Sequence, residues 1–429
     1  MRSTSPEQFG PLPLPLTREP DVAEPVDELA ACPDCGLAQR MRQPQPSQIA
    51  VCARCGAVLE ARGAADLKAP LAFAVTGLFL AAIANLSPLL TVRLAGAVRP
   101  SRLITGPLAL LQDGLGPLGL LVAALSILIP LLWLAGVAYV VASLQFDRRS
   151  PSLAQSFKLA ERLRPLAMVD VFLLGGFVAF TRLRDLATVD IGPGGWALAA
   201  LAVTMVAVDT TLDRRRVWDL IGAPKRAPSL RSANWRTCAV CGLLVEGSPE
   251  RCRRCASHLR DRKPYSLART SALVIAGFIL YVPANLLPVL TVIRFGRARP
   301  NTILSGVREL FGEHMWPLAL IVLLASIVIP LLKLCGLTWL VISVRLKSER
   351  LLLPRTRLYR AIQAIGRWAN IDVFVVSTLV SLVQFGSITS IEPNIGAAVF
   401  AAVVVVTMIA VETFDPRLMW DAAEGRHVR

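Results

Sequence analysis

The feature that most constrains this chain is an internal repeat, in which long apolar segments return after about 200 residues. Self-similarity at a fixed offset is the signature of a duplicated unit. The clearest matched stretches are "ANLSPLLTVR" (84–93) with "ANLLPVLTVI" (284–293), "SILIPLLWLAG" (126–136) with "SIVIPLLKLCG" (326–336), and "MVDVF" (168–172) with "NIDVF" (370–374). The sequence therefore predicts two copies of one architecture, so that each copy can serve as a control for the other.

Each copy contains four apolar segments that are long enough to cross a membrane as helices, which takes about 20 residues. The composition agrees, because 54% of the 429 residues are hydrophobic and only 18% are charged, a balance too apolar for a soluble protein of this size. The sequence predicts an all-α polytopic membrane protein built from two tandem repeats. The eight expected spans lie at about 70–92, 117–145, 166–186, 193–212, 268–292, 316–344, 368–388 and 394–414.

The basic residues predict which ends of the spans face the cytoplasm. They concentrate in the connectors 146–165, 213–267 and 345–367, and cytoplasmic loops of membrane proteins carry such an excess of Lys and Arg. These connectors share one side if both termini are cytoplasmic, and four spans per copy make the duplication parallel. The same distribution accounts for the formal net charge of +16 without a nucleic-acid partner.

Eight of the nine cysteines form four Cys-x-x-Cys pairs, two at the start of each copy. Two such pairs with a short spacer can supply four thiolates to one tetrahedral ion, and cytoplasmic thiols stay reduced, which favours metal over disulfide. A redox dithiol would be expected in a thioredoxin-like βαβ context instead. The sequence predicts two structural Zn²⁺ sites, one with ligands Cys32, Cys35, Cys52 and Cys55 and the other with Cys238, Cys241, Cys252 and Cys255.

These patterns divide the chain into five expected parts. Residues 1–30 are rich in proline and acidic residues and contain no apolar signal-peptide core, so we expect a disordered cytoplasmic tail. The other parts are a small β-rich zinc ribbon at 31–62, a four-helix transmembrane domain at 66–222, a second ribbon at 236–262 and a second transmembrane domain at 266–424.

One charged residue interrupts the apolar repeat, because Lys333 stands where the first copy has Trp133. A lysine at the bilayer centre costs a few kcal/mol or more and usually faces something polar. With about 1.5 Å of rise per residue, the expected topology brings Asp372 and Glu412 to a similar depth. Either these residues only pack helices together, or they form a polar site that gates a substrate or carries a proton. Three hydroxyl residues could join that site, although each more often bonds its own helix backbone: Ser377, Thr407 and Thr413.

An Asn-x-x-Pro pattern recurs near the outer end of the first span of each copy, at 85–88 and 285–288. It predicts a proline kink in which the asparagine amide caps the freed carbonyl, or alternatively the mouth of a lipid or ligand passage. The sequence contains no Gly-rich phosphate loop, no His-rich metal centre and no nucleophile triad. We therefore expect that the protein is not an enzyme.

The doubled Cys-x-x-Cys units, each followed by four spans with Ala-Asn-x-x-Pro-x-Leu and Ser-Ile-x-Ile-Pro-Leu-Leu, resemble the paraquat-inducible protein A family over residues 31–421. The resemblance implies a bacterial inner-membrane protein with zinc at the eight cysteines and tetraspanin-like transmembrane domains. It also implies a functional polar network in the second transmembrane domain, in which Lys333 matches the family's lysine. The implied partner is a periplasm-spanning MCE-domain protein, and the implied substrate is phospholipid.

The expected function is lipid transport between the inner and outer membranes as part of an MCE complex. The lysine and its two acids add the hypothesis that this transport is coupled to protons. Two alternatives stay open, a thiol-redox or stress-responsive membrane protein that uses its Cys-x-x-Cys pairs, and a small-molecule exporter that acts alone. Zinc content tests the first alternative, and co-purification with an MCE protein tests the second.

Overall fold

The computed structural model describes residues 28–41, 49–61, 66–94, 97–148, 150, 152–184, 187–222, 235–247, 249–294, 297–383 and 389–425. Within these ranges, eight helical segments are long and apolar enough to cross a membrane, and each repeat begins with a four-cysteine cluster and small sheets. The predicted fold class is therefore confirmed. Most of the expected N-terminal tail, residues 1–27, lies outside the described residues.

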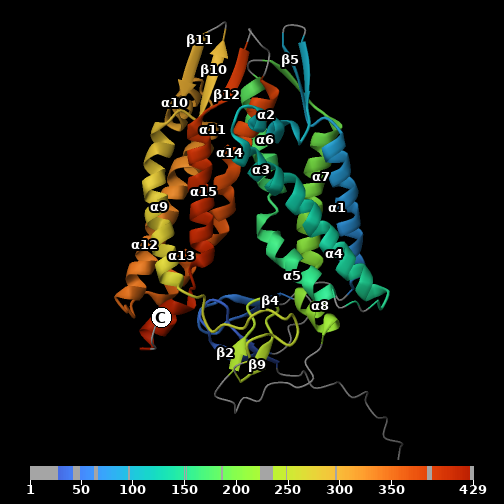
Figure 1. The fold of residues 1–429 in the computed structure, drawn as a ribbon, viewed down its shortest axis with the longest axis vertical. Helices are drawn as coiled ribbons and strands as arrows, with labels where there is room; N and C mark the ends of the chain where they lie inside the picture. Colours follow the sequence, from blue (N-terminus) through green and yellow to red (C-terminus); the bar gives the residue numbers. More distant parts are fainter. Residues whose placement is uncertain are drawn as a thin grey trace, which may run out of the picture.

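Figure 1 shows two helix bundles side by side, with short strands gathered at one end and longer strands at the other. The first half contains β1 (Glu28–Ala31), β2 (Ala38–Met41), β3 (Ile49–Val51), β4 (Val58–Ala61), α1 (Lys68–Leu86), β5 (Leu90–Leu94), β6 (Ala97–Ser101), α2 (Thr105–Gln112), α3 (Gly116–Ala123), η1 (Ala124–Leu128), α4 (Ile129–Gln145), α5 (Leu153–Leu163), η2 (Arg164–Leu166), α6 (Val169–Arg184), β7 (Thr188–Ile191), α7 (Pro193–Thr211) and α8 (Arg214–Ile221). The second half contains β8 (Trp235–Thr237), β9 (Leu244–Glu246), α9 (Ser266–Leu286), β10 (Leu290–Arg294), β11 (Arg297–Asn301), α10 (Ile303–Gly312), α11 (Trp316–Leu323), η3 (Leu324–Val328), α12 (Ile329–Arg345), α13 (Leu352–Ile365), η4 (Gly366–Asn370), α14 (Ile371–Leu382), β12 (Thr389–Pro393), α15 (Ile395–Thr413) and α16 (Arg417–Ala423).

The second span of each half is one 30-residue helix that contains a single π-helical turn, η1 or η3. A proline follows each π turn, Pro130 in α4 and Pro330 in α12. Its ring crowds the carbonyl four residues earlier and it donates no hydrogen bond, and a wider turn accommodates that conflict. Because π turns often mark functional sites, their presence at the repeated Ser-Ile-x-Ile-Pro motif directs attention to this level of the bundle.

At the end away from the cysteines, each half forms a three-stranded antiparallel sheet, in the order β6-β5-β7 and β11-β10-β12. The spans predicted to run to residues 92 and 292 were therefore too long, because α1 ends at Leu86 and α9 at Leu286. The following residues, Leu-Thr-Val, join β5 and β10, since their alternating side chains suit a strand and a later strand completes the sheet.

The predicted proline kinks are also wrong, because Pro88 and Pro288 follow the helices instead of bending them. The predicted capping by asparagine is wrong as well, because neither amide bonds the carbonyl four residues before the proline. The Asn85 amide donates to the carbonyl of Ala81 at 2.7 Å, and the Asn285 amide donates to the carbonyl of Tyr281 at 2.8 Å. Each amide thus bonds a carbonyl one turn earlier within its own helix.

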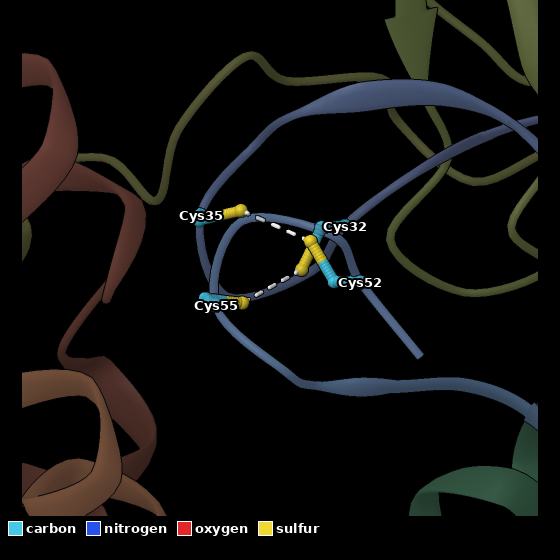
Figure 2. Close-up of side chains that lie close together, drawn as sticks. All are labelled: Cys32, Cys35, Cys52 and Cys55. Atoms are coloured by element: carbon cyan, nitrogen blue, oxygen red, sulfur yellow. Dashed lines mark hydrogen bonds between the residues drawn. The ribbon is translucent and has the colours of Figure 1, made fainter. Parts of the chain in front are cut away.

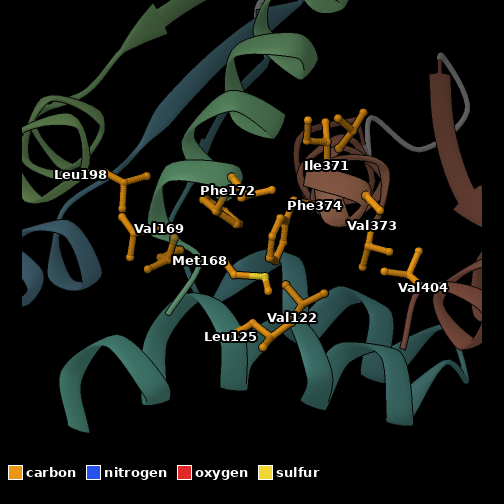
Figure 3. Close-up of a cluster of buried hydrophobic side chains, with 14 of the residues drawn as sticks. Val122, Leu125, Met168, Val169, Phe172, Leu198, Ile371, Val373, Phe374 and Val404 are labelled. Carbon is orange, nitrogen blue, oxygen red and sulfur yellow. The ribbon is translucent and has the colours of Figure 1, made fainter. Parts of the chain in front are cut away.

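The two halves meet where α6 crosses α14, among the buried side chains drawn in Figure 3. Phe172 and Phe374, which occupy matching places in the repeat, stack edge to face with ring centroids 5.3 Å apart. Met168 and Asn370 also match, and the Asn370 amide lies 3.0 Å from the Met168 sulfur. The contact therefore pairs equivalent residues of the two copies, as expected for a parallel duplication with an approximate two-fold axis along the helices.

Candidate metal centres and a buried polar site

The first cysteine cluster has the geometry of a tetrahedral metal site (Figure 2). All four cysteines are buried, and their sulfur atoms lie within 4.8 Å of one another. The Cys32–Cys55 sulfur pair is 3.5 Å apart and the Cys35–Cys52 pair 3.6 Å. Zn–S bonds of about 2.3 Å place the sulfurs of a tetrahedral site about 3.8 Å apart. The observed distances are close to that value, so the donor set fits Zn²⁺.

The chain forms each turn of this cluster with a glycine in the left-handed region, Gly36 at φ +73° and Gly56 at φ +66°. The turn lets the N–H of Gly36 reach the carbonyl of Cys32, and that of Gly56 reach the carbonyl of Cys52, both at 2.9 Å. This backbone conformation strains residues that carry a Cβ atom. The glycine after each knuckle therefore allows both cysteines of a pair to point to one centre.

The second cluster repeats the arrangement. The Cys238–Cys255 and Cys241–Cys252 sulfur pairs are each 3.5 Å apart, and all four side chains are buried. Ala256 replaces the glycine of the last knuckle and takes φ +54°. Both clusters thus fit a metal ion held by four sulfurs, a closed coordination with no position left for a substrate.

The first cluster docks on the transmembrane helices of the second half. The guanidinium of Arg360, in α13, donates to Asp34 at 2.6 Å and to the sulfur of Cys55 at 3.1 Å. The four cysteines share a hydrophobic cluster with Leu418 and Trp420 of α16. Sequence patterns do not indicate this contact, because Arg360 lies in a generally basic segment and nothing distinguishes it there.

The second cluster docks on the first half instead. Arg254 lies between two ligand cysteines, and its side chain donates to Asp219 of α8 at 2.8 Å. The side chains of Cys238, Cys241, Cys252 and Cys255 belong to the hydrophobic core that contains Trp218. Each cysteine cluster therefore contacts the membrane domain of the other repeat.

A buried carboxylate fixes the junction between the second cluster and the end of α15. Asp415 is 1% exposed and accepts hydrogen bonds from the Arg417 guanidinium at 2.9 Å and from the backbone N–H of Lys263 at 3.0 Å. Burial alone would raise the pKa of the Asp415 carboxyl, but the hydrogen bonds and charge of Arg417 outweigh it and hold that pKa below its ordinary value. For Lys263, burial outweighs the attraction of nearby carboxylates and lowers the pKa of its ammonium group.

Lys333 lies inside the protein, with only 2% of its surface exposed. Its ammonium group donates to the backbone carbonyl of Gly366 at 3.0 Å. Gly366 begins the 3-10 segment η4, where the helical hydrogen bonding between α13 and α14 is interrupted. Among the described residues, Lys333 forms no ion pair with Asp372 or Glu412.

The two predicted partner acids lie in different surroundings. Asp372, in the first turn of α14, accepts a hydrogen bond from the hydroxyl of Ser326 in the π turn η3. Ser326 precedes Lys333 by about two helical turns, or roughly 10 Å of rise. Glu412 is exposed, whereas its counterpart in the first copy, Asp209, pairs with Arg164 and Arg214. Sequence reasoning missed Ser326, although its place in the repeated motif was available as a signal.

The remaining candidates bond mainly to their own helices. Thr407 is fully buried and donates to the carbonyl of Val404 at 2.9 Å. Thr413 donates to the carbonyl of Ala410 at 3.0 Å and lies 3.2 Å from the hydroxyl of Thr270. Ser377 is buried, and within the described ranges its hydroxyl has no hydrogen-bond partner. Lys333 with Gly366 and Ser326 with Asp372 are thus separate polar contacts.

The family model for Paraquat-inducible protein A matches residues 67–222 and 267–424, one match in each membrane half. Intermembrane transport protein PqiA of Escherichia coli (strain K12) is 31% identical over 400 residues, which cover 91% of this chain and 95% of that protein. Lipophilic envelope-spanning tunnel protein A of the same strain is 31% identical over 408 residues, 94% of both chains. The Probable intermembrane transport protein of Haemophilus influenzae is 27% identical over 307 residues, 69% of this chain and 70% of that protein.

No solved structure matches the chain significantly. The family match covers both membrane halves, and the two relatives from Escherichia coli align over nearly their whole lengths. This chain therefore belongs to the Paraquat-inducible protein A family.

Proposed function

We propose that this chain moves lipids between the inner and outer membranes of a bacterium, as a multi-pass inner-membrane protein with both termini in the cytoplasm. The observation that carries the proposal is the near-full-length similarity to relatives named for intermembrane transport and for an envelope-spanning tunnel. The eight candidate spans support a place in a membrane. The two closed cysteine sites argue for structure, not catalysis, at those positions.

The proposed partner is a periplasm-spanning MCE-domain protein, which would dock at the end of the bundle that carries the two three-stranded sheets. In support, β6 and β11 are edge strands, and Ala97, Val98, Arg99 and Pro100 of β6 are all exposed. An edge strand presents unpaired N–H and C=O groups to which another chain can add a strand. Co-purification of the full chain with a co-expressed MCE-domain protein tests this part.

The proposed metal is Zn²⁺, held by Cys32, Cys35, Cys52 and Cys55 in one site and by Cys238, Cys241, Cys252 and Cys255 in the other. Four thiolates at the observed distances fit Zn²⁺, and small domains of this size need metal to hold their fold. The role of the ion in this proposal is to keep each cluster folded against the opposite membrane domain.

The proposed transport site is the buried polar region of the second half, with Lys333 as its charged residue. Its ammonium group donates to the carbonyl of Gly366 at the α13–α14 junction. A change in the charge of Lys333 would therefore act on the point where these two helices join. The proposed site also includes three residues of the adjoining helices α14 and α15: Asp372, Ser377 and Thr407. The last turn of α15 would contribute Glu412 and Thr413. Proton coupling is the finer part of the proposal, and its candidate groups are Lys333 and Asp372.

The test compares Lys333→Met with Trp133→Met, the same replacement at the matching position of the first copy. Both positions are buried, at 2% and 3% exposure. Fluorescent phospholipid transfer from proteoliposomes containing the full chain and its MCE partner to acceptor vesicles is measured. We expect Lys333→Met to lower the transfer rate at least tenfold and Trp133→Met to lower it less than twofold.

Equal rates for Lys333→Met and the parent chain would contradict the assigned site. Equal loss in both variants would indicate a packing defect, which also contradicts it. A transfer rate that does not respond to a collapsed pH gradient would remove proton coupling and leave the transport proposal in place. An intact protein that transfers no lipid under any gradient would contradict the function itself.

A further inference from the structure

An apolar cavity lies in the first half, at the end of the helices that carries the sheets. It is enclosed by α2, α6 and α7 together with α14 of the second half, and has a volume of about 170 Å³. The same elements lie next to one another below β5 in Figure 1. An apolar cavity of about 150 Å³ holds one benzene molecule, so this one accommodates part of a single acyl chain and not a whole lipid.

The cavity opens sideways between two candidate spans. Phe177 of α6 and Trp196 of α7 both line it, and they are 59% and 67% exposed. In a membrane-spanning segment, exposed apolar side chains face lipid, and Trp is enriched near the membrane surface. The entrance is therefore placed where an acyl chain from the surrounding bilayer can reach it.

Two polar groups in the wall point to a particular kind of lipid. Ser377 lines the cavity from α14, is 1% exposed, and its hydroxyl has no hydrogen-bond partner among the residues that the structure describes. A buried hydroxyl without a partner is costly, and a ligand that brings an acceptor, such as an ester carbonyl, would satisfy it. Arg102 lies at the rim, is exposed, and forms no ion pair within the described part of the chain. Its guanidinium matches a phosphate group.

We infer that this cavity binds one acyl chain of a phospholipid, with an ester carbonyl at Ser377 and the phosphate at Arg102. The inference rests on the proposed lipid transport for the identity of its ligand and adds a binding site to it. Lys333 does not line the cavity, but Ser377 belongs both to its wall and to the proposed polar region of the second half. The cavity is built from both halves, because Gly106 of α2 approaches Ser377 so closely that a Cβ atom there would lie 2.8 Å from the Ser377 carbonyl oxygen.

The chain offers a way to fill the cavity without disturbing its walls. Gly176 of α6 lines the cavity, and a Cβ atom added there would meet no heavy atom within 4 Å. Gly306 of α10 is the matched control, because it is also helical and also open within 4 Å, but it does not line the cavity. Gly176→Leu should occupy the space of the acyl chain, whereas Gly306→Leu should leave it free.

The experiment uses the purified full chain in nanodiscs containing phosphatidylglycerol with a photoreactive diazirine in one acyl chain. After irradiation, labelled peptides are quantified by mass spectrometry. We expect label on the α6 and α7 peptides, at least a fivefold loss of that label in Gly176→Leu, and no change in Gly306→Leu. A thermal melt of each variant shows that the fold is retained.

Arg102→Gln, a change at the exposed rim, tests the phosphate contact separately. It should lower labelling by the phosphatidylglycerol probe at least threefold and leave labelling by a diazirine diacylglycerol unchanged. The site is overturned if the parent chain carries no label there or if Gly176→Leu is labelled like the parent. The phosphate contact is overturned if Arg102→Gln affects both probes equally. If the cavity is labelled but the chain transfers no lipid, the proposed function is contradicted and the site is not. If the chain transfers lipid but the cavity carries no label, the site is contradicted and the proposed function is not.

Discussion

Two adjacent glycines of α6 provide a strict test of the contact between the two halves. A Cβ atom on Gly175 would lie 2.9 Å from the Phe374 Cβ and 3.2 Å from the carbonyl oxygen of Ile371, both in α14. A Cβ atom on Gly176 would meet nothing within 4 Å. Gly175→Ala and Gly176→Ala therefore make the same chemical change in the same helix, one against the other half and one into open space.

The expected magnitudes follow from two opposing effects. Alanine is favoured over glycine in a helix by about 1 kcal/mol, and this gain applies to both variants. Overpacking a close contact costs about 1–3 kcal/mol, and this cost applies only to Gly175→Ala, because its nearest neighbours include backbone that cannot rotate away. The unfolding free energy of Gly176→Ala should therefore exceed that of Gly175→Ala by about 1–3 kcal/mol.

The measurement is reversible unfolding of the detergent-solubilised full chain by titration with a denaturing detergent, followed by tryptophan fluorescence. Helix retained in the denatured state weakens the propensity gain, but it does so equally for both variants and cancels in their difference. If the two unfolding free energies agree within about 0.3 kcal/mol, or if Gly176→Ala is the less stable, the close approach of α6 to α14 is wrong. The threshold corresponds to the usual uncertainty of additive comparisons.

Two further predictions concern the end of the protein that carries the cysteine clusters. Cys55→Ser should lower the zinc content, measured by mass spectrometry of the purified chain, from two ions to one, whereas Cys335→Ser should leave it at two, since Cys335 belongs to neither cluster; undiminished zinc in Cys55→Ser would contradict the site. The stabilisation from Asp415 should be complete above its ordinary pKa of 3.8 and be lost as the pH falls below it, because Arg417 holds the pKa in the folded chain lower. On acidification, the unfolding free energy of Asp415→Asn should therefore fall less than that of the parent chain. An equal fall in both proteins would contradict the argument.

Local sequence patterns were sufficient for the parts of the fold that depend on neighbouring residues. Cys-x-x-Cys-Gly spacing predicts a turn that brings two sulfurs together, and the structure places Cys32 and Cys35 with the second pair in one buried cluster. The lengths of the apolar runs likewise indicate the eight candidate spans. The helix ends were harder to predict, because residues 90–92 belong to a strand that pairs with β6 on one side and, on the other, with β7, about 100 residues later.

The buried polar site shows a different limit. Counting residues from the membrane surface gives the depth of a side chain but not its direction around the helix axis. Lys333 and Glu412 share an expected depth, yet Lys333 faces the interior and the carbonyl of Gly366, while Glu412 is exposed. The docking of each cysteine cluster on the opposite half was equally hidden, since it depends on contacts such as Cys55 with Arg360 across 305 residues.

That separation has a consequence for the order in which the protein can be assembled. A chain grows at about 5–20 residues per second, so Arg360 is made roughly 15–60 s after Cys55. During this interval six of the eight candidate spans are synthesised, and the first cysteine cluster waits without the surface that will cover it. The four sulfurs stay open to a metal ion throughout that time. The arrival of α13 then covers one side of the cluster and joins the beginning of the chain to a segment made much later.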